Sequence, residues 1–270
     1  MGRDDGILLG AVAYDPKVVT IWEGIREHFV EQGVAFDFAL FSNYERQVEE
    51  LLAGHVDVAW NTPLAHVRVR SRTRGASLSL GMRDSDRDFH AKVIVRRDAG
   101  VRSLRDLEGK RLAVGSRDWT QARILPLHFL KQEGVDLSRV TIVPFDTDLG
   151  KHGDTGTSEL EVLKSLREGT ADAGTIGDLI WVAEQAAARV DAGRVEVLWT
   201  TPGFDHCMFD GRPGLPAAKS EAFRRALFAM LWENARHRRL LELEGLREWM
   251  PPREEGYRSL TDALTDQGRE

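Results

Sequence analysis

Hydrophobic and polar residues alternate with two different periods in the first quarter of the chain, which predicts strands separated by helices. Residues 6–13 form a short apolar run typical of a buried strand. Apolar residues then recur at helical spacing over residues 18–29. Residues 34–40 and 56–60 again have the pattern of strands. Because helical segments connect these three strands, the order predicts a parallel sheet with right-handed connections.

The same order of elements recurs from residue 111 to residue 200. The strand at 111–114 is followed by a Gly-Ser-Arg-Asp loop and by a helix predicted to begin with Trp119, Thr120 and Gln121. Further strands are predicted at 140–145, 171–176 and 195–200, with helices beginning near Ser158 and Asp178; Ser158 and Glu161 have the S-x-x-E spacing of a capping box. The sequence therefore predicts two α/β lobes, residues 1–95 with 203–270 and residues 96–202.

The junction between the strand at 111–114 and the following helix is the expected ligand-binding point. Backbone N–H groups at a helix N-terminus carry partial positive charge. In an open parallel sheet they meet the carboxyl edge of the strands, where ligands bind. We expect the opposite wall of the site to come from the first lobe, at Tyr44 or at Asn61 and Thr62.

Composition excludes several classes of partner. The chain has 270 residues, a formal net charge of -6 and a pI near 5.8, so we expect no nucleic-acid partner. Its one cysteine, Cys207, excludes an internal disulfide and a cysteine-only metal site. No apolar run approaches the roughly 18 residues of a membrane span. Residues 1–13 lack the features of a signal peptide, which predicts a cytoplasmic protein if Met1 is the native start, and a periplasmic or lipid-anchored one if a signal peptide has been removed.

Several segments together resemble the phosphonate-binding family of ABC-transporter substrate-binding proteins. They are VDVAWNTPLAHV (56–67), FHAKVIVRRDAGVRSLRDLEGKRLAVGS (89–116), the helix with Pro126, and TADAGTIGDLIW (170–181). The resemblance implies the type II periplasmic-binding-protein fold, an α/β architecture in which two lobes close over a ligand cleft. It also implies a small-molecule ligand and, if the protein is exported, an ABC permease as partner.

The resemblance places the ligand site at a small set of positions, and several of them differ from the family pattern. An aspartate that holds the ligand's amino group corresponds to Asp178, and Glu159 stands where a histidine is expected. The remaining positions implied by the resemblance are Tyr44, Asn61, Trp119, Thr120 and Gln121. Only Thr120 keeps a hydroxyl at the phosphonate-binding helix start. A carboxylate near a phosphonate dianion is repulsive, so we expect a polar or zwitterionic ligand rather than a simple phosphonate.

The alternative is a cytoplasmic enzyme on the same fold, such as a lyase, dehydratase or synthase. A long polar loop carries His152 and Asp154, and His206 follows the last strand of the second lobe. If these three residues meet, they would form metal ligands or an acid–base pair. The sequence leaves the identity of any metal or cofactor unknown. Cys207 is interpreted as a buried small hydrophobe or a catalytic thiol, and strand alternation predicts that His206 and Cys207 point to opposite faces.

Overall fold

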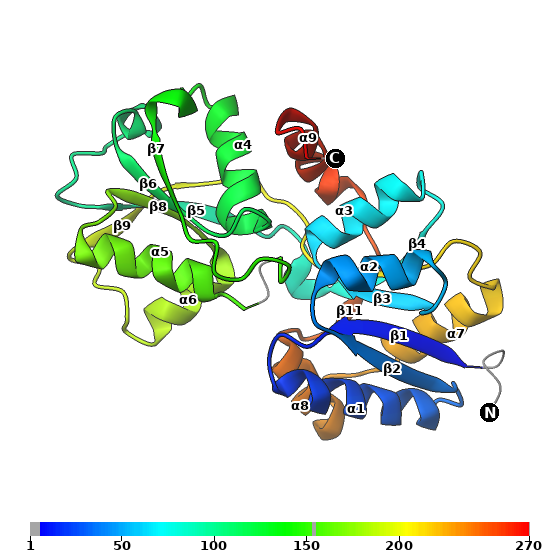
Figure 1. Cartoon of the computed structure of the whole chain (residues 1–270). Helices are drawn as coiled ribbons and strands as arrows, with labels where there is room; N and C mark the ends of the chain where they lie inside the picture. The colour runs from blue at the N-terminus through cyan, green and yellow to red at the C-terminus, as the bar shows by residue number, and fades with distance from the viewer. Residues whose placement is uncertain (1–5, 153–154, 270) are drawn as a thin grey trace. The chain divides into compact units, whose positions relative to one another are not determined.

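The structure is a computed structural model that describes residues 6–152 and 155–269. The chain divides into two units: Met1–Asp88 with Asp205–Tyr257, and Phe89–Phe204 with Arg258–Glu270. The chain therefore passes between the units three times. Each unit contains one mixed sheet covered by helices on both faces (Figure 1).

The sheet of the first unit has the strand order β11-β4-β10-β3-β1-β2. The three parallel strands predicted from the sequence, β1, β2 and β3, lie side by side, and β10 is antiparallel to both β3 and β4. The elements of this unit are β1 (Ile7–Val12), α1 (Lys17–Glu31), β2 (Phe36–Phe41), α2 (Tyr44–Leu52), β3 (Val58–Asn61), α3 (Pro63–Arg72), β4 (Leu78–Arg83), β10 (Met208–Gly211), α7 (Ala217–Phe228), α8 (Ala235–Glu244) and β11 (Trp249–Met250).

The helices of the first unit cover its sheet according to their apolar faces. The predicted stripe of α1 is buried, and it packs with residues of α7 and α8 into one core that includes Phe29, Phe209 and Phe223. Helices α2 and α3 form a separate core on the other face, around Leu51 and Val69. Burial of these two apolar faces stabilises the sheet, and with it the positions of the ends of its strands.

The sheet of the second unit has the order β7-β6-β8-β5-β9. Strand β6 is parallel to β7 and β8, whereas β5 is antiparallel to β8 and β9. The elements of this unit are β5 (Ala91–Arg96), β6 (Arg111–Val114), α4 (Leu125–Gln132), β7 (Thr141–Pro144), α5 (Thr157–Glu168), β8 (Ala173–Gly177), α6 (Asp178–Ala186), β9 (Val195–Thr200) and α9 (Arg258–Asp266).

The division into units differs from the predicted lobes at both ends of the second unit. Residues 89–95 belong to the second unit because β5 pairs with two strands of that sheet. Helix α9, which we assigned to the first lobe, packs on α4. His128 Nδ1 lies 3.3 Å from Asp266 Oδ2, and Gln267 Nε2 donates to the Ile124 carbonyl at 3.1 Å. These long-range contacts have no counterpart in the local sequence pattern.

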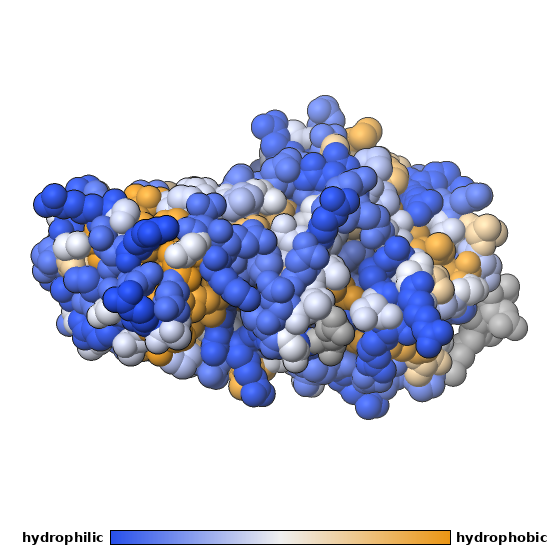
Figure 2. All heavy atoms as spheres, turned by 90° about the horizontal axis from the view of Figure 1, so that it is seen from above, coloured by the Kyte–Doolittle hydropathy of each residue, from blue (hydrophilic) through white to orange (hydrophobic). Residues whose placement is uncertain are grey.

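The described surface agrees with the polar composition of the chain. Hydrophilic residues cover most of the face shown in Figure 2, and hydrophobic residues gather in a few patches among them. Among residues 6–152 and 155–269, no helix combines the length and the apolar character needed to cross a bilayer.

Candidate functional site

The predicted ligand-binding helix start in the second unit is a π-helical turn. Residues Thr120–Ile124 form this turn (η3) between β6 and α4, and Trp119 precedes it with extended backbone. The Arg123 and Ile124 N–H groups both donate to the Trp119 carbonyl, at 3.1 and 3.0 Å. A helical start leaves its first N–H groups without partners inside the helix. We predicted an ordinary α-helix here; the wider turn begins one residue later than predicted.

Thr120 is the residue of this turn with the clearest capacity to bind a ligand. Its side chain is fully buried, and within the described part of the chain its Oγ1 has no hydrogen-bond partner. Buried hydroxyls almost always have a partner, so this hydroxyl is suited to bond to a group that the protein does not supply. The hydroxyl and the nearby N–H groups are the donors that an oxyanion requires.

Glu159, in α5, connects the residue before this turn to the end of β8. Its carboxylate accepts hydrogen bonds from the Trp119 indole N–H at 2.9 Å and the Gly177 N–H at 2.6 Å. Its side chain is buried, and this burial raises its pKa from 4.5 to about 7, against the opposing effect of those bonds and of Gln121. These contacts go to the protein, so a direct contact between Glu159 and a ligand stays a prediction.

The predicted capping box at the start of α5 is wrong. The residue before this helix is Gly156, in the left-handed region at φ 67°, and it makes no side-chain cap. Ser158 lies inside the helix, and its Oγ instead accepts the Ser116 N–H at 3.3 Å. The first turn of helix α5 therefore bonds to the loop after β6. The S-x-x-E spacing gives no indication of this contact.

Asp178 is the first residue of α6 and remains partly accessible. Its N–H donates to the His90 carbonyl at 3.0 Å, which fixes the helix start against β5. Its carboxylate lies 2.6 Å from Lys92 Nζ, and the side chain is 28% exposed. The carboxylate is therefore already paired with a cation, but it can still reach solvent.

The residues predicted in the first unit lie at the ends of β3 and the starts of α2 and α3. Thr62 precedes α3 and Tyr44 begins α2, and both side chains are buried. Asn61 ends β3, and both polar atoms of its amide are bonded: Nδ2 donates to Asp210 Oδ2 at 2.8 Å, and Oδ1 accepts from Gln47 Nε2 at 2.7 Å. Contacts of these residues with a ligand stay predictions.

The partners of Asn61 form a buried polar network that sequence analysis missed. Asp210, on β10, also bonds to His66 Nδ1 at 2.9 Å, and the ring centroids of His66 and Tyr257 are 4.3 Å apart. Asp210 is 0% and His66 1% exposed. A carboxylate in the otherwise apolar segment CMFDG was the available signal, because an acidic residue rarely occupies such a position unpaired.

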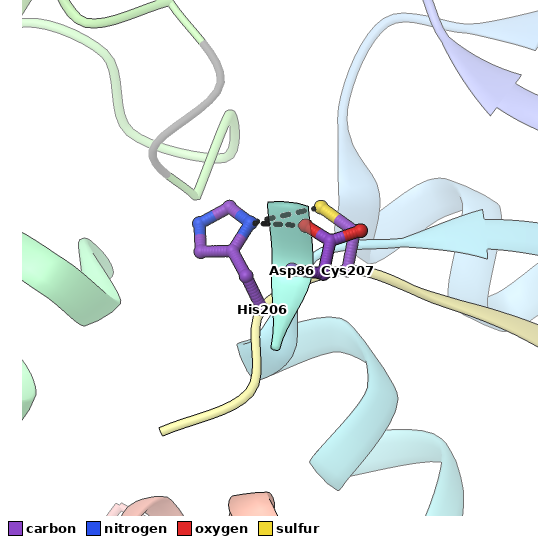
Figure 3. A group of neighbouring side chains, drawn as sticks. All are labelled: Asp86, His206 and Cys207. Atoms are coloured by element: carbon purple, nitrogen blue, oxygen red, sulfur yellow. Dashed lines mark hydrogen bonds and ion pairs between the residues drawn. The ribbon is translucent and has the colours of Figure 1, made fainter. Parts of the chain in front are cut away.

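His206 lies in the first unit beside Asp86 and Cys207 (Figure 3). Its Nδ1 is 3.1 Å from Cys207 Sγ and 3.4 Å from Asp86 Oδ1. The prediction that His206 and Cys207 point to opposite faces is wrong, because regular strand geometry begins only at Met208. Cys207 is buried, as the interpretation as a small hydrophobe requires.

His152 belongs to the second unit and is buried beside another carboxylate. Its Nε2 lies 3.6 Å from Asp118 Oδ2, which also accepts the Gly150 N–H at 2.6 Å. Asp154 lies outside the described residues. The predicted convergence of His152, Asp154 and His206 stays a prediction, since His152 and His206 belong to different units.

Comparison with known proteins supplies the family. Residues 12–257 match the family described as "ABC transporter, phosphonate, periplasmic substrate-binding protein". The chain belongs to this family. The "Probable ABC transporter phosphite binding protein PhnD1" of Prochlorococcus marinus strain MIT 9301 is 20% identical to this substrate-binding protein over 230 residues, which cover 82% of this chain and 74% of the relative.

Solved structures confirm the fold of this substrate-binding protein. PhnD1 from Prochlorococcus marinus in complex with methylphosphonate has a TM-score of 0.75 at 18% identity, covering 98% of this chain and 99% of the other. XAC2383 from Xanthomonas citri bound to ATP has the same TM-score and identity, covering 98% of both chains. The alkanesulfonate-binding protein SsuA from Xanthomonas axonopodis pv. citri bound to MOPS has a TM-score of 0.59 at 14% identity, covering 100% of this chain and 95% of the other.

The family and the fold confirm the predicted class of protein. The chain is an α/β substrate-binding protein of the phosphonate-binding type with a periplasmic-binding-protein fold. The family description implies a small-molecule ligand and an ABC permease, and it names the periplasm. It gives no support to the alternative of a cytoplasmic lyase, dehydratase or synthase.

Proposed function

We propose that this substrate-binding protein captures a small organic oxyanion outside the cytoplasmic membrane and delivers it to an ABC permease. The observation that carries the proposal is the buried Thr120 hydroxyl at the start of the π-helical turn, for which the described residues supply no hydrogen-bond partner. A hydroxyl beside the backbone N–H groups of a helical start suits an oxyanion such as a phosphonate or a carboxylate. The relative PhnD1, whose solved structure contains methylphosphonate, favours the same class of ligand.

We further propose that the ligand is zwitterionic, with an amine near its anionic group. Asp178 supports this, because its partly exposed carboxylate follows the carboxyl end of β8, the strand that pairs with β6, and β6 leads to the turn. A ligand ammonium would compete with Lys92 for this carboxylate, whereas an unsubstituted alkylphosphonate has no cationic group that could pair with it. Because Asp178 is already paired with Lys92, a ligand ammonium gains less binding free energy from this carboxylate, so the preference for an amine should be moderate.

Titration calorimetry with two ligands tests both parts of this proposal. We expect 2-aminoethylphosphonate to bind about 10-fold more tightly than methylphosphonate, since one charge-assisted hydrogen bond contributes about 1.5 kcal/mol. Asp178→Asn should remove that difference and leave methylphosphonate binding unchanged. Equal affinity for both ligands in the unmodified protein would contradict the zwitterion, and binding of neither would contradict the oxyanion.

The role of Thr120 predicts a separate loss of affinity. Thr120→Val keeps the shape of the side chain but removes the hydroxyl, so we expect affinity for either phosphonate to fall about 10- to 100-fold. Thr170→Val is a matched control in the same unit, because the Thr170 hydroxyl already bonds to the Ser165 carbonyl at 3.2 Å. Unchanged calorimetric affinity in Thr120→Val would remove Thr120 from the site.

A further inference from the structure

Three side chains of the first unit bring a nitrogen, a sulfur and an oxygen donor to one point. Asp86 follows β4, whereas His206 and Cys207 come from the segment that leads into β10, far away in the sequence (Figure 3). One donor atom from each residue can be chosen so that all three lie within 4.8 Å of one another, and all three residues are buried. The backbone fixes this arrangement, because the His206 N–H donates to the Asp86 carbonyl at 2.8 Å.

We propose that Asp86, His206 and Cys207 bind a divalent transition-metal ion of the zinc class. Tetrahedral zinc has bonds of about 2.0–2.3 Å to these atom types, so its donor atoms lie about 3.4–3.6 Å apart. The separation of His206 Nδ1 from Asp86 Oδ1 is 3.4 Å, and that from Cys207 Sγ is 3.1 Å. The nitrogen–sulfur distance would have to widen by a few tenths of an ångström, and the oxygen–sulfur separation, which lies within 4.8 Å, would have to take the zinc value. Water would take the fourth position.

The surrounding charges suit a divalent ion once the thiol has lost its proton. Arg83 holds Asp86 through Nε at 2.8 Å and Nη2 at 2.7 Å, and its Nη1 lies 3.6 Å from Glu244 Oε1. Arg83 and the ion together carry three positive charges. Asp86, Glu244 and the Cys207 thiolate carry three negative charges, so the buried group is neutral overall, as a low-dielectric interior requires.

Arg83 also orients the metal ligand that it contacts. Its side chain is 12% exposed, its Cζ lies 5.4 Å from the centroid of the Trp60 ring, and its Nη1 donates to the Glu244 carbonyl at 2.8 Å. Carboxylates that bind metals are commonly held in this way by a second layer of hydrogen bonds. Because Asp86 Oδ2 takes two of the hydrogen bonds, from Nε and from the Arg83 backbone N–H, Oδ1 retains a lone pair for the ion.

The position of this site suggests what the ion does. The chain leaves the first unit after Asp88 and returns at Asp205, so Asp86 and His206 lie next to two of the three crossing points. An ion bound to both segments would cross-link them where they leave the unit. The proposed role is therefore structural, and it does not depend on which ligand the substrate-binding protein captures.

Cobalt is the probe that tests this site, because Co²⁺ adopts zinc geometries and gives a thiolate charge-transfer band in the near ultraviolet. After treatment with a chelator, the full-length protein should bind one Co²⁺ with such a band, and Zn²⁺ should abolish it. Cys207→Ser should lose the band and His206→Ala should weaken binding at least 10-fold. His55→Asn is the matched control, since His55 forms an exposed pair with Glu50 at 2.6 Å in the same unit.

Thermal unfolding gives a second readout that does not require the band. Saturating Zn²⁺ should raise the Tm of the unmodified protein by roughly 5 °C. Cys207→Ser is nearly isosteric, so it should fold but respond less to zinc. Absence of the thiolate band, or a band and a Tm shift that survive in Cys207→Ser, would overturn the proposal. Loss of metal binding in His55→Asn would instead indicate adventitious surface binding and would also overturn it.

Discussion

Replacing Asp210 with alanine should lower the free energy of unfolding by about 2–5 kcal/mol, because each buried donor left without an acceptor costs roughly 1–3 kcal/mol. The Asp210 carboxylate is fully buried and accepts from both Asn61 Nδ2 and His66 Nδ1. The alanine variant leaves both donors buried without an acceptor. Urea unfolding followed by circular dichroism measures the change directly.

Two further experiments distinguish the loss of this hydrogen-bond network from a general effect of removing an aspartate. Asp37→Ala removes a carboxylate from β2 whose side chain is 68% exposed, so it should change stability by no more than about 0.5 kcal/mol. A double-mutant cycle with His66→Ala should show strong coupling, because the second change removes one of the donors left without a partner. A loss below about 1 kcal/mol in Asp210→Ala, or additive effects in the cycle, would contradict this account.

Local sequence patterns predicted the elements of this fold well because each depends on residues close in the chain. The apolar stripe of α1 is buried as predicted, and β1, β2 and β3 are parallel. The antiparallel position of β10 between β3 and β4 could not be predicted in this way. It depends on a chain that returns from the other unit, which periodicity within one segment does not record.

The candidate site shows the same limit at the level of single residues. The position of Asn61 was predicted from the family resemblance, but its partners Asp210 and Gln47 are remote in sequence and were missed. His206 and Cys207 were assigned to opposite faces because their segment was read as a strand. The strand begins at Met208, so the two side chains converge on Asp86 instead.

Glu159 should make stability fall as the pH rises from about 4.5 to about 7. Its pKa is about 7 in the folded protein and 4.5 ordinarily, so the folded state holds a proton that the unfolded chain has lost between these values. The unfolding free energy therefore decreases over that interval, and the full difference of about 3 kcal/mol is reached above both pKa values. Below pH 4.5 both states are protonated and Glu159 makes no such contribution.

Glu159→Gln isolates this contribution from the other titrating groups. Glutamine cannot ionise, yet its carbonyl can still accept from the Trp119 indole or the Gly177 N–H. The difference in unfolding free energy between the unmodified protein and this variant should shift by about 3 kcal/mol between pH 4 and pH 8, in favour of the variant at pH 8. Glu161→Gln is the matched control on the same helix, because that side chain is 36% exposed and pairs loosely with Lys164 at 3.4 Å. A pH-independent difference for Glu159→Gln would mean that the hydrogen bonds from Trp119 and Gly177 balance the effect of burial, so that the pKa of Glu159 is the same in the folded and unfolded states.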